Sequence, residues 1–163
     1  MTVRQIRYFG DPVLRTECST IVCIDQGVRQ LVQDLLDTVQ PDGRAGVAAT
    51  QIGHTQRAFS YNVDGQQGYV LNPEIVSLEG EPVPTGEGCL SVPGLWFDVL
   101  RYPRATVRGI DLDGNTVEIT GEGTLAQAFQ HECDHLEGKL YIHRLEGDDR
   151  REAMKQIRQS DWF

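Results

Sequence analysis

Residues 124–137 read TLAQAFQHECDHLE, and this stretch has the pattern of an amphipathic helix. Apolar residues recur at helical spacing and mark one side: Leu125, Ala128, Phe129 and Leu136. Thr124 is suited to cap the start of the helix, and Gly138 is suited to end it. We therefore expect a helix from Thr124 to Glu137, with one face in the core.

Two histidines and a glutamate lie in this helix at a spacing that suits a metal ion. Residues four apart differ by about 40° of rotation, so His131 and His135 present their rings to the same point. Glu132 lies about a third of a turn away, where it reaches a water held by the ion. The alternative is a pair of solvated surface histidines. The apolar flanks Phe129 and Leu136 favour a buried helix, in which imidazoles need partners.

The helix supplies two ligands, whereas a catalytic site needs three and an open position for water. Cys89, in the stretch Glu87–Ser91, is the candidate third ligand, because the glycines beside it let the backbone approach a ligand closely. The alternative is a small buried residue in a strand. Cys133 lies about 200° around the helix from His131 and is expected to pack into the core.

Composition limits the class of protein. The 163 residues hold 39 % apolar and 24 % charged residues, which indicates one globular domain over residues 1–163. The net charge of −9 opposes binding to DNA or to an anionic membrane. No apolar run has the roughly 18 residues of a membrane span, and Met1 to Gly10 lacks a signal-peptide core. We expect a cytoplasmic protein whose cysteines stay reduced.

The rest of the chain indicates an α+β fold. One helix is expected over about 25–39, with Asp25 as its N-cap, and another over about 148–158. Short β-rich runs separated by turn residues cover 58–63, 69–71, 74–78, 95–100, 105–111 and 116–120. Asn72-Pro73 is expected to be a turn, and Asp113-Gly114-Asn115 a hairpin turn. The expected architecture is mostly antiparallel strands flanking a central helix that carries His-Glu-x-x-His, with N-terminal and C-terminal helices.

Three motifs in order resemble the peptide deformylases, the enzymes that remove the N-formyl group from nascent bacterial or organellar polypeptides. They are GVAATQ at 46–51, EGCLS at 87–91 and QHECDH at 130–135. The stretch GDPVLR at 10–15 also fits, so the similarity spans almost the whole chain. The resemblance implies a mixed α+β fold with the third motif on a central helix.

The resemblance also implies a role for individual residues. It makes Cys89, His131 and His135 the metal ligands and Glu132 the general acid and base. Gln51, through its side-chain amide, and Leu90, through its backbone N–H, would donate to the oxygen of the formyl group. The implied substrate-binding residues are Arg44, Ala45, Gly46, Glu87 and Gly88. Glu87 is further expected to pair with an arginine such as Arg101, the alternative being a solvated carboxylate.

Fe²⁺ is the natural ion that the resemblance implies, with Zn²⁺, Ni²⁺ or Co²⁺ able to occupy the site. The implied partners are N-formylmethionyl nascent peptides, met near the ribosome. The charges of residues 144–158 are mixed, which favours a solvated helix face over an RNA-docking surface.

The first motif departs from the family pattern. Arg44 stands where a glycine is usual, Ala45 where a larger aliphatic residue is common, and Val47 where leucine is usual. Our hypothesis is that Arg44 projects outward and leaves the pocket for the methionine side chain open. Two rival functions share the helix motif. One is a zinc endopeptidase with a third ligand from His or Glu, and the other is a metal- or peptide-binding module without turnover.

Overall fold

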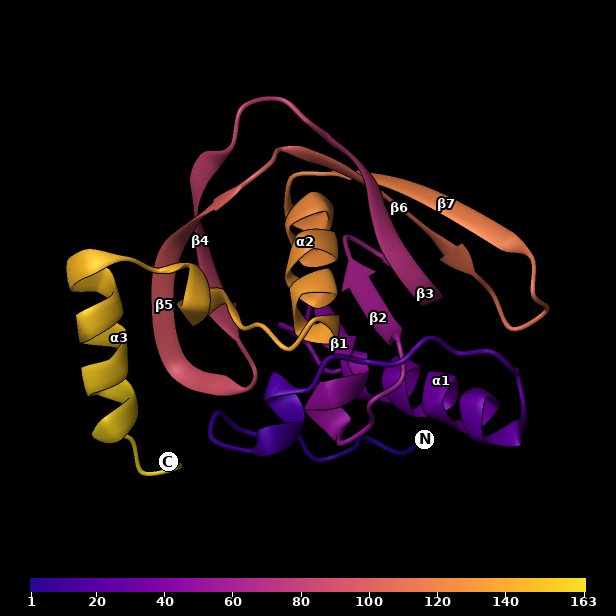
Figure 1. The fold of residues 1–163 in the computed structure, drawn as a ribbon, viewed down its shortest axis with the longest axis horizontal. Helices are drawn as coiled ribbons and strands as arrows, with labels where there is room; N and C mark the ends of the chain where they lie inside the picture. Colours follow the sequence, from indigo (N-terminus) through magenta and orange to yellow (C-terminus); the bar gives the residue numbers. More distant parts are fainter.

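The computed structural model describes residues 1–163 and joins three α-helices to two antiparallel sheets (Figure 1). The α-helices are α1 (Gln26–Val39), α2 (Thr124–Leu136) and α3 (Gly147–Arg158), and the short 3-10 helices are η1 (Pro12–Arg15), η2 (Ala49–Ile52) and η3 (Tyr141–Arg144). The strands are β1 (Gly46–Ala48), β2 (Ala58–Val63), β3 (Gln66–Glu79), β4 (Val83–Cys89), β5 (Val92–Arg101), β6 (Arg104–Ile110) and β7 (Thr116–Glu122). The expected α+β class is confirmed.

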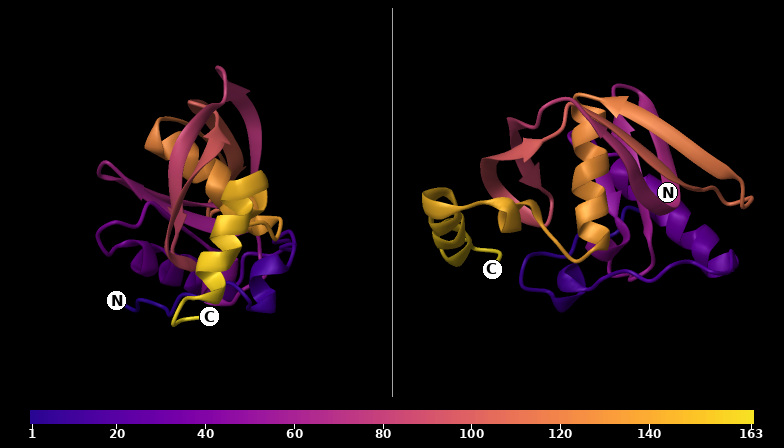
Figure 2. Two further views of the ribbon diagram at one scale, coloured as in Figure 1. Left: turned by 90° about the vertical axis from the view of Figure 1, so that its left-hand side faces the viewer. Right: turned by 45° about the horizontal axis from the view of Figure 1, so that its top comes forward.

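The two sheets lie on either side of α2. One has five strands in the order β1-β2-β3-β6-β7, and the other is the hairpin of β4 and β5. Figures 1 and 2 show α2 standing between this hairpin and the five-stranded sheet, with α1 against the sheet and α3 outside the hairpin. This arrangement places residues of α2 within reach of β1 on one side and of β4 on the other.

The three α-helices follow the sequence pattern, with one error at a cap. Asp25 accepts a hydrogen bond from the N–H of Val28 and caps α1 as expected. The expectation that Thr124 caps α2 is wrong, because Thr124 is the first helical residue and Gly123 is the N-cap. Gly123 has φ 57° and ψ −126°, a backbone conformation that a side chain would disfavour.

The strands differ more from expectation. The expected turn at Asn72-Pro73 is wrong, since β3 runs through it as one strand with a register shift between Leu71 and Glu74. Asn72 adopts φ 50°, and its side chain bonds the N–H and the C=O of Ile21. The sequence at Asn72-Pro73 locally favours a turn, but these hydrogen bonds to Ile21 keep it within strand β3. The hairpin turn at residues 113–115 is confirmed, since β6 pairs with β7 across it.

None of the helices combines the length and the apolar character that a bilayer crossing requires. The last residues of the chain, after α3, contact Tyr8 and Phe9 of the N-terminal segment. Trp162 packs edge-on against Tyr8, with ring centroids 5.6 Å apart, and its Nε1 donates to the carbonyl oxygen of Pro93.

Candidate active site

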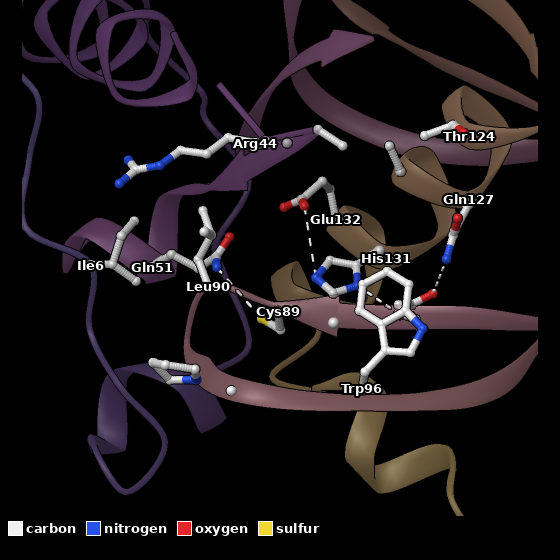
Figure 3. Close-up of a pocket in the computed structure, with 18 of the residues that line it drawn as sticks. Ile6, Arg44, Gln51, Cys89, Leu90, Trp96, Thr124, Gln127, His131 and Glu132 are labelled. Carbon is white, nitrogen blue, oxygen red and sulfur yellow. Dashed lines mark hydrogen bonds and ion pairs between the residues drawn. The ribbon is translucent and has the colours of Figure 1, made fainter. Parts of the chain in front are cut away.

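Three potential metal ligands converge from two elements (Figure 3). Cys89 ends β4, and His131 and His135 lie four residues apart on α2. The Sγ of Cys89 lies 3.4 Å from the Nε2 of His135, which lies 3.2 Å from the Nε2 of His131. The ligand atoms of all three residues lie within 4.8 Å of one another. The structure thus brings together the three residues that the sequence singles out.

The donor set fits one tetrahedral ion. Nitrogens at the usual bond length from such an ion lie about 3.3 Å apart, and a nitrogen and a thiolate sulfur lie about 3.6 Å apart. The Nδ1 of His131 lies 2.7 Å from the Glu87 carboxylate, to which it donates, and its Nε2 faces the cluster. Burial, the largest effect, lowers the pKa of His135 well below its ordinary value, so this ring is neutral and able to ligate.

Glu87 and Arg101 form a buried ion pair behind the ligands. The Nη2 of Arg101 lies 2.6 Å from the Oε2 of Glu87, so the expected pairing is confirmed. Arg101 also bonds Asp134 at 3.1 Å, and Asp134 bonds Arg144 at 2.7 Å. Burial raises the pKa of Glu87, but hydrogen bonds from Arg101 and His131 outweigh it and bring the value to about 2. A charged Glu87 therefore fixes the orientation of the His131 ring.

Glu132 lies beside the ligand cluster, and its carboxylate packs against Gly46 of β1. Its Oε1 is 3.9 Å from the Nε2 of His131, and its Oε2 is buried without a protein partner. A Cβ on Gly46 would lie 2.8 Å from Oε1, so only glycine at this position leaves room for the carboxylate. Burial raises the pKa of Glu132 to about 7, which suits a group that accepts and returns a proton at neutral pH.

Two further donors border the cluster. The Oε1 of Gln51 accepts from the N–H of Ala48 at 2.9 Å, which fixes the amide and turns its Nε2 toward the Sγ of Cys89, 3.7 Å away. The same Nε2 lies 3.2 Å from the Oγ of Ser91. Leu90 follows the last residue of β4, and its N–H has no acceptor within the protein. The Leu90 N–H is thus free for an oxygen placed near Cys89, and the Gln51 amide nitrogen lies beside the same place, where it now bonds Cys89 and Ser91.

A pocket of about 630 Å³ opens over these groups. Every predicted site residue except His135, which is buried beneath it, lines this pocket, including Ala45, Glu87 and Gly88. Figure 3 shows the Arg44 side chain extending away from Glu132, and its Nη1 donates to the carbonyl oxygen of Thr38 at the end of α1. Val47 does not line the pocket but is buried against α1.

Sequence reasoning missed several pocket residues. These include Ile6, Tyr8, Pro93, Trp96, Thr124 and Gln127. Helical spacing provides a signal for two of them, since Gln127 precedes His131 by four residues and Thr124 precedes Gln127 by three. Trp96 has no such signal, because it comes to the site through the register of β5 on β4.

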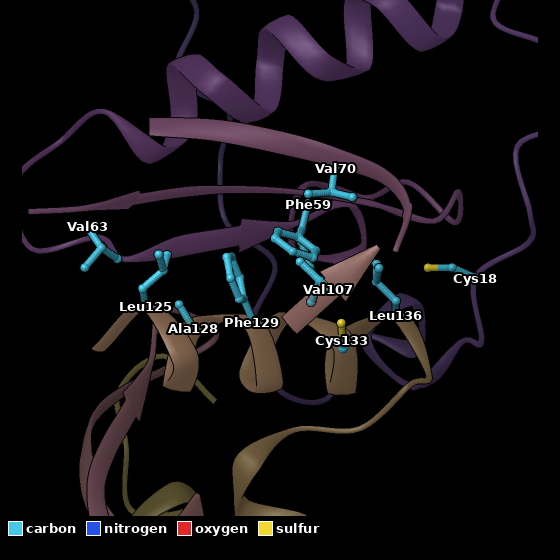
Figure 4. Packing of buried hydrophobic residues seen from close by; sticks show 11 residues of the cluster. Cys18, Phe59, Val63, Val70, Val107, Leu125, Ala128, Phe129, Cys133 and Leu136 are labelled. Carbon is cyan, nitrogen blue, oxygen red and sulfur yellow. The ribbon is translucent and has the colours of Figure 1, made fainter. Parts of the chain in front are cut away.

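The opposite side of α2 anchors the helix (Figure 4). Its apolar residues pack with side chains of β2, β3 and β6 in one buried cluster: Leu125, Ala128, Phe129, Cys133 and Leu136. Phe59 and Phe129 lie at its centre, with ring centroids 6.1 Å apart. This packing fixes the position of α2, and with it the two histidines, relative to the five-stranded sheet. The expectation that Cys133 packs into the core is confirmed.

Comparison with known proteins agrees with this geometry. The family model described as polypeptide deformylase matches residues 3–151. A peptide deformylase of Acidothermus cellulolyticus is 44 % identical over 162 residues, which cover 99 % of this chain and 89 % of that protein. The crystal structure of a peptide deformylase from Legionella pneumophila superimposes with a TM-score of 0.90 at 37 % identity, covering 97 % of this chain and 95 % of that one.

A peptide deformylase from Ehrlichia chaffeensis, solved in complex with actinonin, has a TM-score of 0.89 at 32 % identity over the whole of both chains. The matched regions thus include the three potential metal ligands, Glu132 and the residues that line the pocket. The chain belongs to the polypeptide deformylase family.

Proposed function

We propose that Cys89, His131 and His135 hold the divalent ion with which this chain removes the N-formyl group of nascent polypeptides. The chain is a metal-dependent hydrolase of the deformylase family, and its substrates are formylated nascent peptides. The observation that carries the ligand assignment is the convergence of one Sγ and two Nε2 atoms beside a buried glutamate. Fe²⁺ is the proposed natural ion. The soft thiolate together with imidazole also suits Zn²⁺, Ni²⁺ or Co²⁺.

The ion, when bound, supplies Lewis acidity that acidifies a water and polarises the formyl oxygen. Glu132 accepts the proton of the attacking water, whose oxygen forms a bond to the formyl carbon. Gln51 Nε2 and the Leu90 N–H donate to the formyl oxygen as negative charge develops on it, each worth roughly 3 kcal/mol in comparable sites. Glu132 then returns the proton to the departing nitrogen as the C–N bond breaks, which leaves a free amine and formic acid, and the acid loses its proton to water as formate.

The substrate lies along the β1 and β4 backbones in this proposal. Arg44, Ala45 and Gly46 border it on one side, and Glu87 and Gly88 border it on the other, because all five residues line the pocket. The proposal treats α2 as the central helix of one catalytic domain over residues 1–163. A cytoplasmic protein that meets nascent chains at the ribosome, and that binds neither DNA nor membranes, agrees with the substrate class and with the net charge of −9.

The test separates metal binding from proton transfer. Glu132→Ala should lose hydrolysis of formyl-methionyl peptides and keep its metal, whereas Cys89→Ala should lose the metal itself. Both are compared with the wild-type chain, purified without oxygen, by a formate-release assay and by metal analysis of the same samples. Retained deformylation in the Glu132 variant would sink the mechanism. Cleavage of internal peptide bonds would instead support the endopeptidase.

A further inference from the structure

Gln127 presents a hydrogen-bond acceptor to the pocket. It lies one helical turn before His131 and on the same face of α2. Its Nε2 donates to the carbonyl oxygen of Gly86 at 2.9 Å and to the Oε1 of Glu87 at 3.1 Å. Because both partners are acceptors, the orientation of the amide is fixed. Its nitrogen is occupied by these two bonds, so the amide oxygen of Gln127, labelled in Figure 3, is the atom left for a ligand.

Thr124 and Trp96 complete this end of the pocket. Thr124 lies three residues before Gln127, and its exposed hydroxyl has no partner in the protein. The indole of Trp96 covers the backbone of β4, where a Cβ on Gly86 would lie 2.6 Å from it. Trp96 is 71 % exposed, a large apolar surface left at the mouth of the pocket. The end of the pocket is therefore aromatic on one side and carries two polar groups on the other.

The distance along α2 between His131 and Gln127 indicates which substrate side chains are long enough to contact these polar groups. One helical turn rises about 5.4 Å. When the formyl carbon lies at the ligand cluster beside Glu132, an unbranched side chain on the first residue spans a similar length. A side chain of this length that runs along α2 toward the N-terminus of the helix therefore brings its tip near the amide oxygen of Gln127. A methionine tip forms no hydrogen bond there, whereas an uncharged amide donates to Gln127 and accepts from the hydroxyl of Thr124.

We propose that Gln127 is a specificity-determining residue that lets the pocket take a first residue with an amide side chain, as in formyl-glutaminyl peptides, beside formyl-methionyl peptides. This inference rests on the proposed function. A glutamate side chain has the same length but offers only acceptors, and it would face the acceptor of Gln127 and the carboxylate of Glu87. The pocket therefore distinguishes glutamine from glutamate and discriminates only weakly between glutamine and methionine.

Three formylated tripeptides that differ only in the first residue, methionine, glutamine or glutamate, test the proposal. The metal-loaded wild-type chain should turn over the glutamine peptide well above the glutamate peptide. Gln127→Met removes the amide at equal length and should raise the methionine-to-glutamine ratio of kcat/KM by about tenfold or more. Thr124→Val should raise it in the same direction, without touching a buried group.

Gln33→Met is the matched control, since Gln33 is exposed on α1 and bonds only Asp37. It should keep the wild-type ratio. An unchanged ratio in both Gln127→Met and Thr124→Val, or equal turnover of the glutamine and glutamate peptides, would overturn the role of Gln127. Failure of the metal-loaded wild-type chain on the formyl-methionyl peptide would instead overturn the proposed function.

Discussion

Gly46 is the residue on which the position of the Glu132 carboxylate depends. A Cβ at Gly46 would lie 2.8 Å from the Oε1 of Glu132 and 2.9 Å from its Cγ. Gly46→Ala should therefore displace the carboxylate and lower kcat by roughly 100-fold, as a shift of about 1 Å in a reacting group does. The metal content should stay the same. Formate release under saturating peptide, with metal analysis of the same sample, measures both quantities.

The control for this change is Gly27→Ala near the start of α1. Gly27 is a glycine without a positive φ, and it lies far along the chain from the ligands. Its kcat should equal that of the wild-type chain. A Gly46→Ala protein with wild-type kcat would mean that Glu132 and β1 adjust together and that the close approach has no catalytic importance.

Arg101 is a second residue whose replacement should have a large effect, here on the free energy of unfolding. It is 2 % exposed and bonds both Glu87 and Asp134. Arg101→Met would leave buried carboxylates short of a partner, which costs about 3–5 kcal/mol of the free energy of unfolding. Arg104→Met removes exposed pairs with Glu79 and Glu122 and should change stability much less. Urea unfolding of both variants measures the difference, and equal midpoints would contradict the prediction.

At the scale of elements, the packing of α2 determines which cysteines react. Burial raises the pKa of Cys18 to about 11 and that of Cys133 to about 12, so both thiols stay protonated at neutral pH. Both belong to the cluster between α2 and the sheet (Figure 4). Cys23 is exposed. A thiol reagent at neutral pH should label Cys23 first and leave Cys18 and Cys133 unlabelled until the chain unfolds.

Mass spectrometry of the labelled peptides provides the measurement, with urea-unfolded protein as the fully labelled reference. Metal-loaded protein should be used, because a bound ion also covers the thiol of Cys89. Labelling of Cys133 as fast as that of Cys23 would show that α2 separates from the sheet in the native state, and it would contradict the packing described here.

The helices were predictable from sequence because their signals are local. Asp25 caps α1 through a bond to a residue only three positions away, and the apolar stripe of α2 repeats within the helix itself. Strand boundaries depend on partners distant in sequence. Asn72 looks like a turn residue, but its side chain bonds Ile21, 51 positions earlier, and β3 continues through it. No local pattern contains that information.

The active site shows the same contrast between features with a local sequence signal and features that depend on contacts between distant residues. His131, Glu132 and Cys89 could be found because each lies in a short motif with its own spacing. The register of β5 on β4 brings Trp96 over the glycines of β4, and the fold of the N-terminal segment brings Tyr8 to the same pocket. Neither arrangement follows from spacing along the chain. The chemistry was therefore predictable, whereas the shape of the pocket required the structure.

At the scale of the whole molecule, the C-terminal Trp162 supports the pocket from outside. Its Nε1 donates to the carbonyl oxygen of Pro93 at 3.0 Å, and its ring packs against Tyr8. Pro93 and Tyr8 both line the pocket, whereas Trp162 does not. Trp162→Ala should therefore raise KM for formyl-methionyl peptides several-fold, because the two lining residues become less ordered and binding must order them. The effect on kcat should be small, since the ligands belong to β4 and α2.

Trp162→Phe keeps an aromatic ring against Tyr8 and removes only the hydrogen bond to Pro93, so its KM should lie between those of Trp162→Ala and the wild-type chain. Leu78→Ala, an exposed apolar residue of β3 away from the pocket, is the control and should keep the wild-type KM. Steady-state kinetics and thermal unfolding are measured on the same metal-loaded samples. A lower Tm in Trp162→Ala with an unchanged KM would mean that the tail stabilises the fold without shaping the pocket. A rise in KM without a matching loss in kcat supports a pocket whose outer wall depends on the contact between Trp162 and Tyr8.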